Sequence, residues 1–401
     1  MKNKINQYNL ISISHFFYPR VGGLENMAYG LVKNLSDKGF KSIAIFGNDR
    51  NLKFESDGFT WKSFNTIKLF KGTYPILGIR FFLFCLNTIK DNPNAVVLLH
   101  DRHLTSSIIG ALICKFLNRD YIVISHTTVS NYFQNKFFEI LSVLFEKLIS
   151  KMVLNNASHI ICVSRSNKDY IIKNFNIDSY KTSVIYNCFK DDSISRFYQK
   201  VKSKTVIFNT KLSLVKDPNT AALAFLELAR KYTDWKFVIA GEGSSILDEM
   251  NDLPLNLEYK PKFLPQLEVF ELLGDSSIYI NSSLNEGLSL GVIEAASLGN
   301  IVVLSDAPGN VEVANNLSCS KYIFERKNYK DLVSKIEMAI NDIEHPGFTN
   351  LQEKISHLAY LHFSPKSIYN KYSDFISKYK ADTIVFKENK QKLKVKIKDY
   401  Y

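Results

Sequence analysis

Short apolar runs alternate with segments of helical periodicity along most of this chain, and this alternation limits the possible folds more than any other feature. The first example is a predicted strand at residues 8–14, a turn-rich loop at 15–23, a helix over 24–37 and a strand at 41–46. The pattern continues with strands at 95–99, 121–125, 159–163 and 183–186, and helices over 104–116 and 137–154. Since strands that alternate with helices form parallel sheets covered on both faces, the sequence predicts a doubly wound α/β fold.

A second series of the same kind follows a polar stretch at residues 187–204, whose composition is typical of an interdomain linker. Its predicted strands cover 205–209, 236–240, 277–281 and 301–305, and its predicted helices cover 218–232, 264–273 and 289–298. With 401 residues, the chain has room for two such domains. We expect an N-terminal domain over 1–190, a C-terminal domain over 191–364, a closing helix at 365–380 that packs back on the first domain, and a basic tail at 387–401.

Composition narrows the functional classes. The formal net charge of +12 favours an anionic partner such as nucleic acid, phospholipid headgroups or a diphosphate, although compositional drift in a lysine-rich chain explains it equally well. The five cysteines contain no CxxC pair, so they indicate a reducing compartment rather than a disulfide framework or zinc ribbon. No apolar run is long enough to span a membrane, and the stretch at 10–17 is too weak for a signal peptide, so we expect a cytoplasmic location.

The lysine-rich tail at 387–398 carries six lysines and one glutamate. This charge run predicts a mobile or membrane-facing tail, with a plain solvated tail as the alternative. Two basic and aromatic stretches, at 68–84 and 135–152, are candidates for an amphipathic surface on an anionic membrane. For the second stretch, a helix packed on the sheet is an equally good interpretation.

Candidate binding residues follow predicted strands, because ligands of open α/β sheets bind at the carboxyl ends of the strands. Gly22 and Gly23 lie between a strand and a helix, where backbone amides can approach an anion, although a simple turn also explains them. His126 directly follows a strand and is placed to hydrogen-bond a ligand hydroxyl. Three other histidines also lie at strand ends, so spacing does not choose among His15, His100, His103 and His126.

Two lysines follow the strand that opens the second series. The ammonium groups of Lys211 and Lys216 suit a diphosphate, and a solvated loop is the alternative. The segment SSLNEGLSLGVIEAASLG carries a stronger signal, because Glu286 and Gly287 lie on a loop after a strand and Ser289 is placed to cap the next helix. A phosphate near residues 287–290 would meet free N–H groups and the positive end of the helix dipole. In the early turns of that helix, the carboxylate of Glu294 can accept hydrogen bonds from the two hydroxyls of a ribose.

The two glutamates in NEGLSLGVIEAASLG, with their E-x7-E spacing, resemble the signature of family 4 glycosyltransferases with the GT-B fold. The segments YPRVGGLENMAYGLVKNLSDKGF, VSRSNKDYI, VIYNC and IAGEGS are similar to other motifs of this family, in the same order, over roughly residues 8–380. The resemblance implies two doubly wound Rossmann-like domains that face each other across a cleft. The first would bind the acceptor and the second a nucleotide-sugar donor.

The resemblance also implies roles for individual residues. Glu294 would bind the nucleotide ribose and Glu286 the hydroxyls of the donor sugar. Backbone N–H groups for the diphosphate or sugar would come from Gly287, Leu288, Ser289 and Leu290. Lys216 matches the family's diphosphate lysine, Gly22 and Gly23 match the loop that closes over the phosphates, and His126 matches a histidine near the reacting sugar. Lys211 departs from the family's usual arginine, and a lysine keeps the charge without the bidentate fork.

The resemblance implies a hexosyltransferase that retains anomeric configuration and moves a sugar from a UDP- or GDP-sugar to a glycan or lipid-linked acceptor, with front-face attack by the acceptor hydroxyl. We expect no cofactor and no metal, since no DxD pair follows a strand. The expected setting is bacterial surface polysaccharide synthesis, such as capsule or O-antigen, on the cytoplasmic face of the inner membrane. A sugar-nucleotide epimerase and a catalytically weak nucleotide-sugar-binding scaffold are the alternatives, whereas the absence of a recognition motif argues against nucleic acid.

Overall fold

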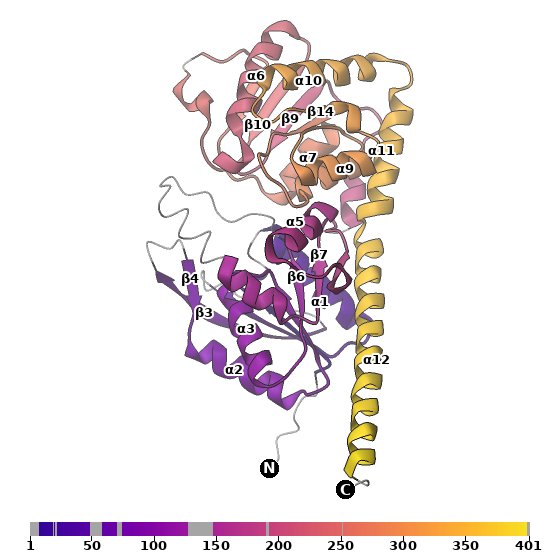
Figure 1. Cartoon of the computed structure of the whole chain (residues 1–401). Helices are drawn as coiled ribbons and strands as arrows, with labels where there is room; N and C mark the ends of the chain where they lie inside the picture. Colours follow the sequence, from indigo (N-terminus) through magenta and orange to yellow (C-terminus); the bar gives the residue numbers. More distant parts are fainter. Residues whose placement is uncertain are drawn as a thin grey trace. The chain divides into compact units, whose positions relative to one another are not determined.

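The computed structural model describes residues 8–18, 20, 22–48, 58–69, 74–126, 147–189, 192–250 and 252–398. Contacts within the chain define two compact units (Figure 1). The first unit contains Met1–Ser125, Leu148–Ile161 and Lys366–Tyr401, and the second contains His126–Lys147 and Cys162–Pro365.

The first sheet has eight strands in the order β4-β3-β2-β1-β5-β6-β7-β8. The central strands β1 (Leu10–Ser14) and β5 (Val96–His100) are buried along their whole length, as expected for strands covered on both faces. Strands β3, β2, β1, β5 and β6 are parallel, whereas β4 runs antiparallel to its neighbour β3. The remaining strands are β2 (Ser42–Asn48), β3 (Thr60–Leu69), β4 (Tyr74–Leu77), β6 (Ile122–Ser125), β7 (His159–Cys162) and β8 (Thr182–Val184).

The described helices of the first unit include α1 (Gly23–Asp37), α2 (Ile79–Asp91), α3 (Thr105–Phe116) and nearly all of α12 (Pro365–Lys398). Residues 148–155 of this unit are also helical. Helix α1 buries Met27, Leu31 and Leu35, which share one face at helical spacing. Helix α12 buries Tyr372 and Ile376 completely. The helix continues to residue 398, so the backbone of the lysine-rich tail is helical up to that point (Figure 1).

The second unit contains a parallel six-stranded sheet in the order β11-β10-β9-β12-β13-β14. Its strands are β9 (Thr205–Asn209), β10 (Lys236–Ala240), β11 (Leu257–Lys260), β12 (Ile278–Asn281), β13 (Ile301–Ser305) and β14 (Ile323–Phe324). Its α-helices are α5 (Arg165–Phe175), α6 (Pro218–Lys231), α7 (Gln266–Asp275), α8 (Leu290–Ser297), α9 (Pro308–Asn316), α10 (Tyr329–Glu344) and α11 (Phe348–Phe363). The predicted pair of doubly wound sheets is confirmed.

Three features differ from the predicted organisation. The polar stretch at 187–204 is not a bare linker, because Phe189 and Ile194 are buried in the core of the second unit and Asp192–Phe197 forms a 3-10 helix. Residues 162–189, expected in the first domain, belong to the second unit. In that unit α5 packs against α9, and Glu312 of α9 accepts hydrogen bonds from the backbone N–H groups of Arg165 (2.8 Å) and Ser166 (3.0 Å).

The third difference is the hairpin β3–β4 and the helix α2, which the apolar pattern did not predict. Most of the helix expected over 137–154 lies outside the described residues, which resume at 147 in helical conformation. Among the helices described, none is both long enough and apolar enough to cross a membrane.

Candidate functional site

The order of the second sheet reverses between β9 and β12, which lie side by side. Strands β10 and β11 extend the sheet on one side of this point, and β13 and β14 extend it on the other. In doubly wound sheets the crevice beyond the carboxyl ends of such a strand pair binds ligands. The loop after β9 carries Lys216, and the loop after β12 carries Glu286, so both predicted residues lie at this switch point.

A direct ion pair joins these two loops. The Nζ atom of Lys216 donates a hydrogen bond to Oε1 of Glu286, and the hydroxyl of Ser283 donates to the same oxygen (3.1 Å). The Lys216 side chain keeps 26% of its surface exposed and that of Glu286 keeps 11%. The lysine is therefore held by the carboxylate, while part of its side chain stays exposed.

Two more sets of hydrogen bonds fix the relative position of the loops. The hydroxyl of Ser282 donates to the carbonyl oxygens of Lys216 (2.9 Å) and Asp217 (2.8 Å), and the N–H of Leu284 donates to the carbonyl oxygen of Val215 (2.8 Å). These bonds are made by the backbone or by short side chains, so they cost little side-chain entropy. The Lys216–Glu286 pair thus lies on a preorganised frame, which is what electrostatic catalysis requires.

The loop then enters helix α8 at Leu290 without a side-chain cap. Among the described residues, the backbone N–H groups of Gly287, Leu288 and Ser289 have no hydrogen-bond acceptor. The predicted cap by Ser289 is wrong, because its hydroxyl instead accepts a hydrogen bond from Nδ2 of Asn281 (3.2 Å). Uncapped amides at the positive end of a helix dipole form a suitable place for a phosphate.

Glu294 lies in the second turn of α8 and is 8% exposed. The negative charges of Glu294 and Glu286 both influence the pKa of Tyr279, a buried residue of β12. Burial is the main reason that the pKa of Tyr279 is raised, and the two negative charges raise it further. The Tyr279 hydroxyl therefore stays protonated and donates to the carbonyl oxygen of Asn209 at the end of β9 (3.0 Å).

Two glycines allow the loop after β9 to run close to the loop after β10. Gly241 and Gly243 have positive φ values of 141° and 132°. A Cβ atom at either position would clash with the carbonyl oxygen of Thr210 or Leu212. The glycines of the IAGEGS segment therefore serve the close backbone approach that lines this edge of the sheet.

The structure brings five predicted residues together in the second unit: Lys216, Glu286, Gly287, Ser289 and Glu294. Leu288 and Leu290 pack in or against the core of this unit, so their side chains are not available to a ligand. Lys211 is exposed on the loop after β9. His126 follows β6 and is half-buried, while Gly22 and Gly23 lie at the start of α1.

Sequence reasoning missed Asn281 and Asn310, whose side chains form hydrogen bonds that support the loop between β12 and α8. Oδ1 of Asn281 accepts hydrogen bonds from the N–H of Ser283 (3.0 Å) and from Nδ2 of Asn310 (3.1 Å), which also donates to Ser305 Oγ (2.9 Å). Both asparagines are almost fully buried. An asparagine that ends an apolar strand was the one available signal, since a buried amide needs partners.

Two family models match the chain. The model described as Glycosyltransferase Family 4 matches residues 21–192, and the model described as Glycosyl transferases group 1 matches residues 190–357. The first match begins at the Gly22–Gly23 loop, and the second contains the whole site around Glu286.

Among curated proteins, one subunit of the human phosphatidylinositol N-acetylglucosaminyltransferase is 26% identical over 351 residues, which are 83% of this chain and 68% of that protein. The O-antigen chain mannosyltransferase RfbU of Salmonella typhimurium is 26% identical over 227 residues, 55% of this chain and 62% of that protein.

Among solved structures, HepE of Anabaena in complex with UDP superimposes with a TM-score of 0.67 at 15% identity, over 92% of this chain and all of that chain (100%). This likeness concerns the fold. Together with the two family models, it shows that the chain belongs to the family 4 glycosyltransferases with the GT-B fold, and that it is a glycosyltransferase.

Proposed function

We propose that the chain transfers a sugar from a nucleoside-diphosphate donor, with UDP as the first choice of nucleotide, to a lipid-linked acceptor. The observation that carries the proposal is the Lys216–Glu286 pair beside the three backbone N–H groups of residues 287–289 that lack an acceptor among the described residues. A diphosphate supplies the missing acceptors, and a sugar attached to it supplies hydroxyls for Glu286. The UDP complex of HepE supports the choice of nucleotide.

On the donor side, each residue has a separate task. Glu294 binds the two ribose hydroxyls, because a carboxylate can accept both hydrogen bonds. Lys216 and the amides of residues 287–289 bind the phosphates. Glu286 holds the Lys216 side chain in place and accepts hydrogen bonds from the hydroxyls of the donor sugar. Charge develops on the departing diphosphate as the sugar–phosphate bond breaks, so these fixed positive groups stabilise the transition state.

The remaining residues complete the proposal. Lys211 adds a second ammonium group on the leaving-group side, where it replaces the family's arginine. Gly22 and Gly23 close over the phosphates, and His126 lies near the reacting sugar. The acceptor hydroxyl attacks from the face that the diphosphate leaves, so the anomeric configuration is retained, and no divalent cation takes part.

Two kinds of acceptor are compatible with the relatives. The relatives from human, Arabidopsis and yeast are named for transfer of N-acetylglucosamine to phosphatidylinositol, and the Salmonella relative is named for O-antigen synthesis. We favour an acceptor on a lipid carrier. Phosphatidylinositol and a lipid-linked surface glycan are the two candidates to assay.

The test combines donor binding with product analysis. We expect UDP and one UDP-sugar to raise the melting temperature of the wild type, and Glu294→Ala to abolish this rise. Glu271→Ala, an exposed carboxylate on α7, is the matched control that keeps it. With phosphatidylinositol or a lipid-linked glycan present, the wild type should release UDP and form a product of unchanged anomeric configuration.

Three outcomes would contradict the proposal. Release of a free epimerised sugar nucleotide would identify an epimerase. Nucleotide binding without turnover on either acceptor would identify a binding scaffold. A product of inverted configuration, or activity abolished by a chelator and restored by a divalent cation, would refute the retaining, metal-independent mechanism.

A further inference from the structure

A pocket of about 540 Å³ lies in the first unit, between strand β3 and the start of helix α2. Strand β4 pairs with Thr66–Leu69 of β3, and no other strand of the described residues pairs with β3 on this side, so residues 60–65 form an edge of the described sheet. The pocket occupies this edge. Its lining consists of Lys62, Ser63, Phe64, Asn65, Gly78, Ile79, Arg80 and Phe81.

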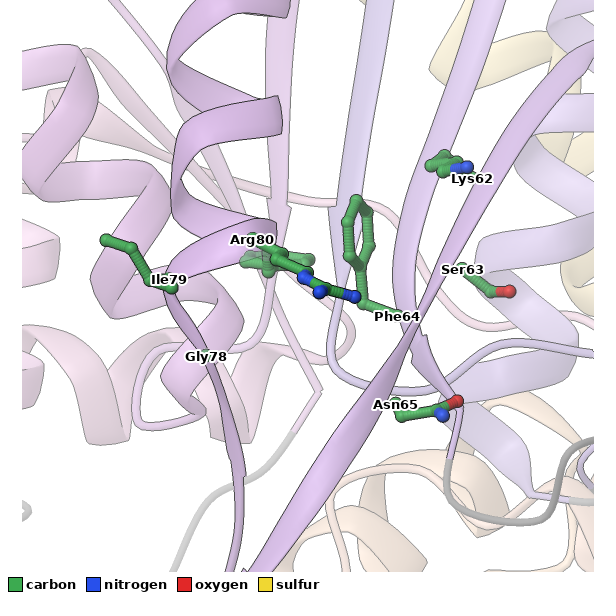
Figure 2. Close-up of a pocket in the computed structure, with 8 residues that line it drawn as sticks. Lys62, Ser63, Phe64, Asn65, Gly78, Ile79 and Arg80 are labelled. Carbon is green, nitrogen blue, oxygen red and sulfur yellow. The ribbon is translucent and has the colours of Figure 1, made fainter.

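Aromatic packing holds the two walls of the pocket together. The Phe64 ring of β3 meets the Phe81 ring of α2 edge to face, with centroids 5.4 Å apart, and lies 5.5 Å from the Phe84 ring. Figure 2 shows the Arg80 guanidinium group reaching from the start of α2 toward Phe64. Because Phe64 and Lys62 share one face of β3, the packing also fixes the backbone positions from which Lys62 and Arg80 extend.

No residue that the structure describes neutralises the positive charge in this pocket. None of the eight lining residues is acidic, and neither Lys62 nor Arg80 forms an ion pair with any residue that the structure describes. A lysine on an edge strand can serve simply to prevent pairing with another chain. That explanation does not cover Arg80, which comes from a helix and reaches into the same pocket.

Apolar side chains are exposed on α2, the helix that carries Arg80. Ile79 is 68% exposed and Leu83 is 48% exposed, and they lie one turn apart on the same face of α2. Figure 2 shows Ile79 directed away from β3. Ile79 lines the pocket together with Arg80 and Lys62. Leu83 lies one turn further along α2, so an exposed apolar surface continues from the cationic pocket along the helix. This arrangement matches a ligand with an anionic head and an apolar body.

We propose that this pocket binds the phosphate group of an anionic phospholipid in a membrane surface, with Arg80 and Lys62 on the phosphate oxygens and Ile79 and Leu83 against the acyl chains. The volume suits a phospholipid headgroup, since ligand pockets usually measure about 300–1,000 Å³. The inference goes beyond the proposed function, because this pocket lies in the first unit, contains none of the proposed donor residues, and Lys216, Glu286 and Glu294 lie in the second unit.

The test is co-sedimentation of the full chain with vesicles, in the absence of any sugar donor. We expect the wild type to bind vesicles of phosphatidylcholine mixed with phosphatidylglycerol and not vesicles of phosphatidylcholine alone. The double variant Lys62→Ala/Arg80→Ala should partition about thirtyfold more weakly, from the usual contribution of two cations near an anionic leaflet. Ile79→Ser/Leu83→Ser should also reduce binding to the mixed vesicles.

Matched controls separate the pocket from the general charge of the chain. Lys33→Ala/Lys173→Ala removes the same charge from exposed sites on α1 and α5, and Leu267→Ser/Leu361→Ser removes exposed leucines from α7 and α11. Both controls should bind the mixed vesicles as the wild type does. An equal loss in the charge control and in Lys62→Ala/Arg80→Ala would overturn the proposal in favour of diffuse attraction.

A soluble ligand is distinguished in the same series. If inorganic phosphate or glycerol phosphate raises the melting temperature through Lys62 and Arg80 while vesicle binding does not depend on them, the pocket serves a free phosphate and the lipid assignment is wrong. The shift caused by UDP should be unchanged in Lys62→Ala/Arg80→Ala. If UDP did not raise the melting temperature of the wild type while the wild type still bound vesicles, the result would count against the proposed function and not against the lipid pocket.

Discussion

At Gly309, the first turn of α9 touches the donor loop. A Cβ atom at this position would lie 2.5 Å from the carbonyl oxygens of Glu286 and Gly287, closer than real Cβ atoms approach. Gly309→Ala must therefore displace the loop or the start of α9. We expect it to lower the free energy of unfolding by about 1–3 kcal/mol. It should also weaken UDP binding, because the displaced loop carries Glu286 and the free amides.

Urea unfolding and a nucleotide titration measure both effects. Gly347→Ala is the control, because a Cβ atom there has nothing within 4 Å and the φ of −84° suits alanine. Its unfolding free energy should stay within about 0.5 kcal/mol of the wild type. If Gly309→Ala matched the wild type in both measurements, the close approach of α9 to the donor loop would matter neither for stability nor for UDP binding.

The site residues that the sequence could predict are those whose role depends on local spacing. Glu286 and Glu294 lie on one loop and the helix that follows it, and Lys216 lies on the loop after the other strand of the switch point. Tyr279 and Asn310 could not be predicted, because their roles arise from contacts between loops. The prediction that Ser289 caps α8 was wrong for the same reason, since the Ser289 hydroxyl accepts a hydrogen bond from Asn281 instead.

Among the elements, α12 gives the sharpest test of how the first unit is built. Ile376 is completely buried, and the Tyr379 hydroxyl one turn later is 2.5 Å from Ser158 Oγ. Ile376→Ala should lower the free energy of unfolding by about 2–5 kcal/mol, through lost burial and the cavity left behind. Lys378→Ala, an exposed position on the same helix, should change it by no more than about 0.5 kcal/mol.

Chemical denaturation of both variants gives the comparison. If Ile376→Ala does not fold, Ile376→Val should still show a loss of about 0.5–1.5 kcal/mol. Equal stabilities for Ile376→Ala and Lys378→Ala would mean that α12 contributes nothing to the core of this unit.

Strands with a mostly apolar sequence gave a clear signal, whereas β3 did not. Strand β13 is apolar from Ile301 to Leu304 and was predicted at its observed bounds. Strand β3, with the sequence TWKSFNTIKL, is half polar because it lies near the edge of its sheet, so it lacks the continuous apolar signal of a central strand. The prediction of a linker at 187–204 failed for the opposite reason, because a few buried side chains, among them Phe189 and Ile194, are enough to anchor a mostly polar segment.

For the whole molecule, the two units should respond to a donor nucleotide differently. The residues that we propose for ribose and phosphate binding and that the structure brings together lie in the second unit, whereas Ile376 lies in the first. UDP at about 100 times its dissociation constant should stabilise the second unit by about 2.7 kcal/mol, because ligand binding adds only to the unit that holds the site. In calorimetry, UDP should therefore move one unfolding transition upward, and Ile376→Val should move the other one downward.

Combining the two perturbations makes this prediction stringent. Changes at independent sites are additive, so the shift caused by UDP should be the same in Ile376→Val and in the wild type. Glu294→Ala should lose the UDP shift and leave the transition of the first unit in place. A single transition that moves with both UDP and Ile376→Val would show instead that the units unfold together, in which case the donor site would be stabilised by the core that α12 completes.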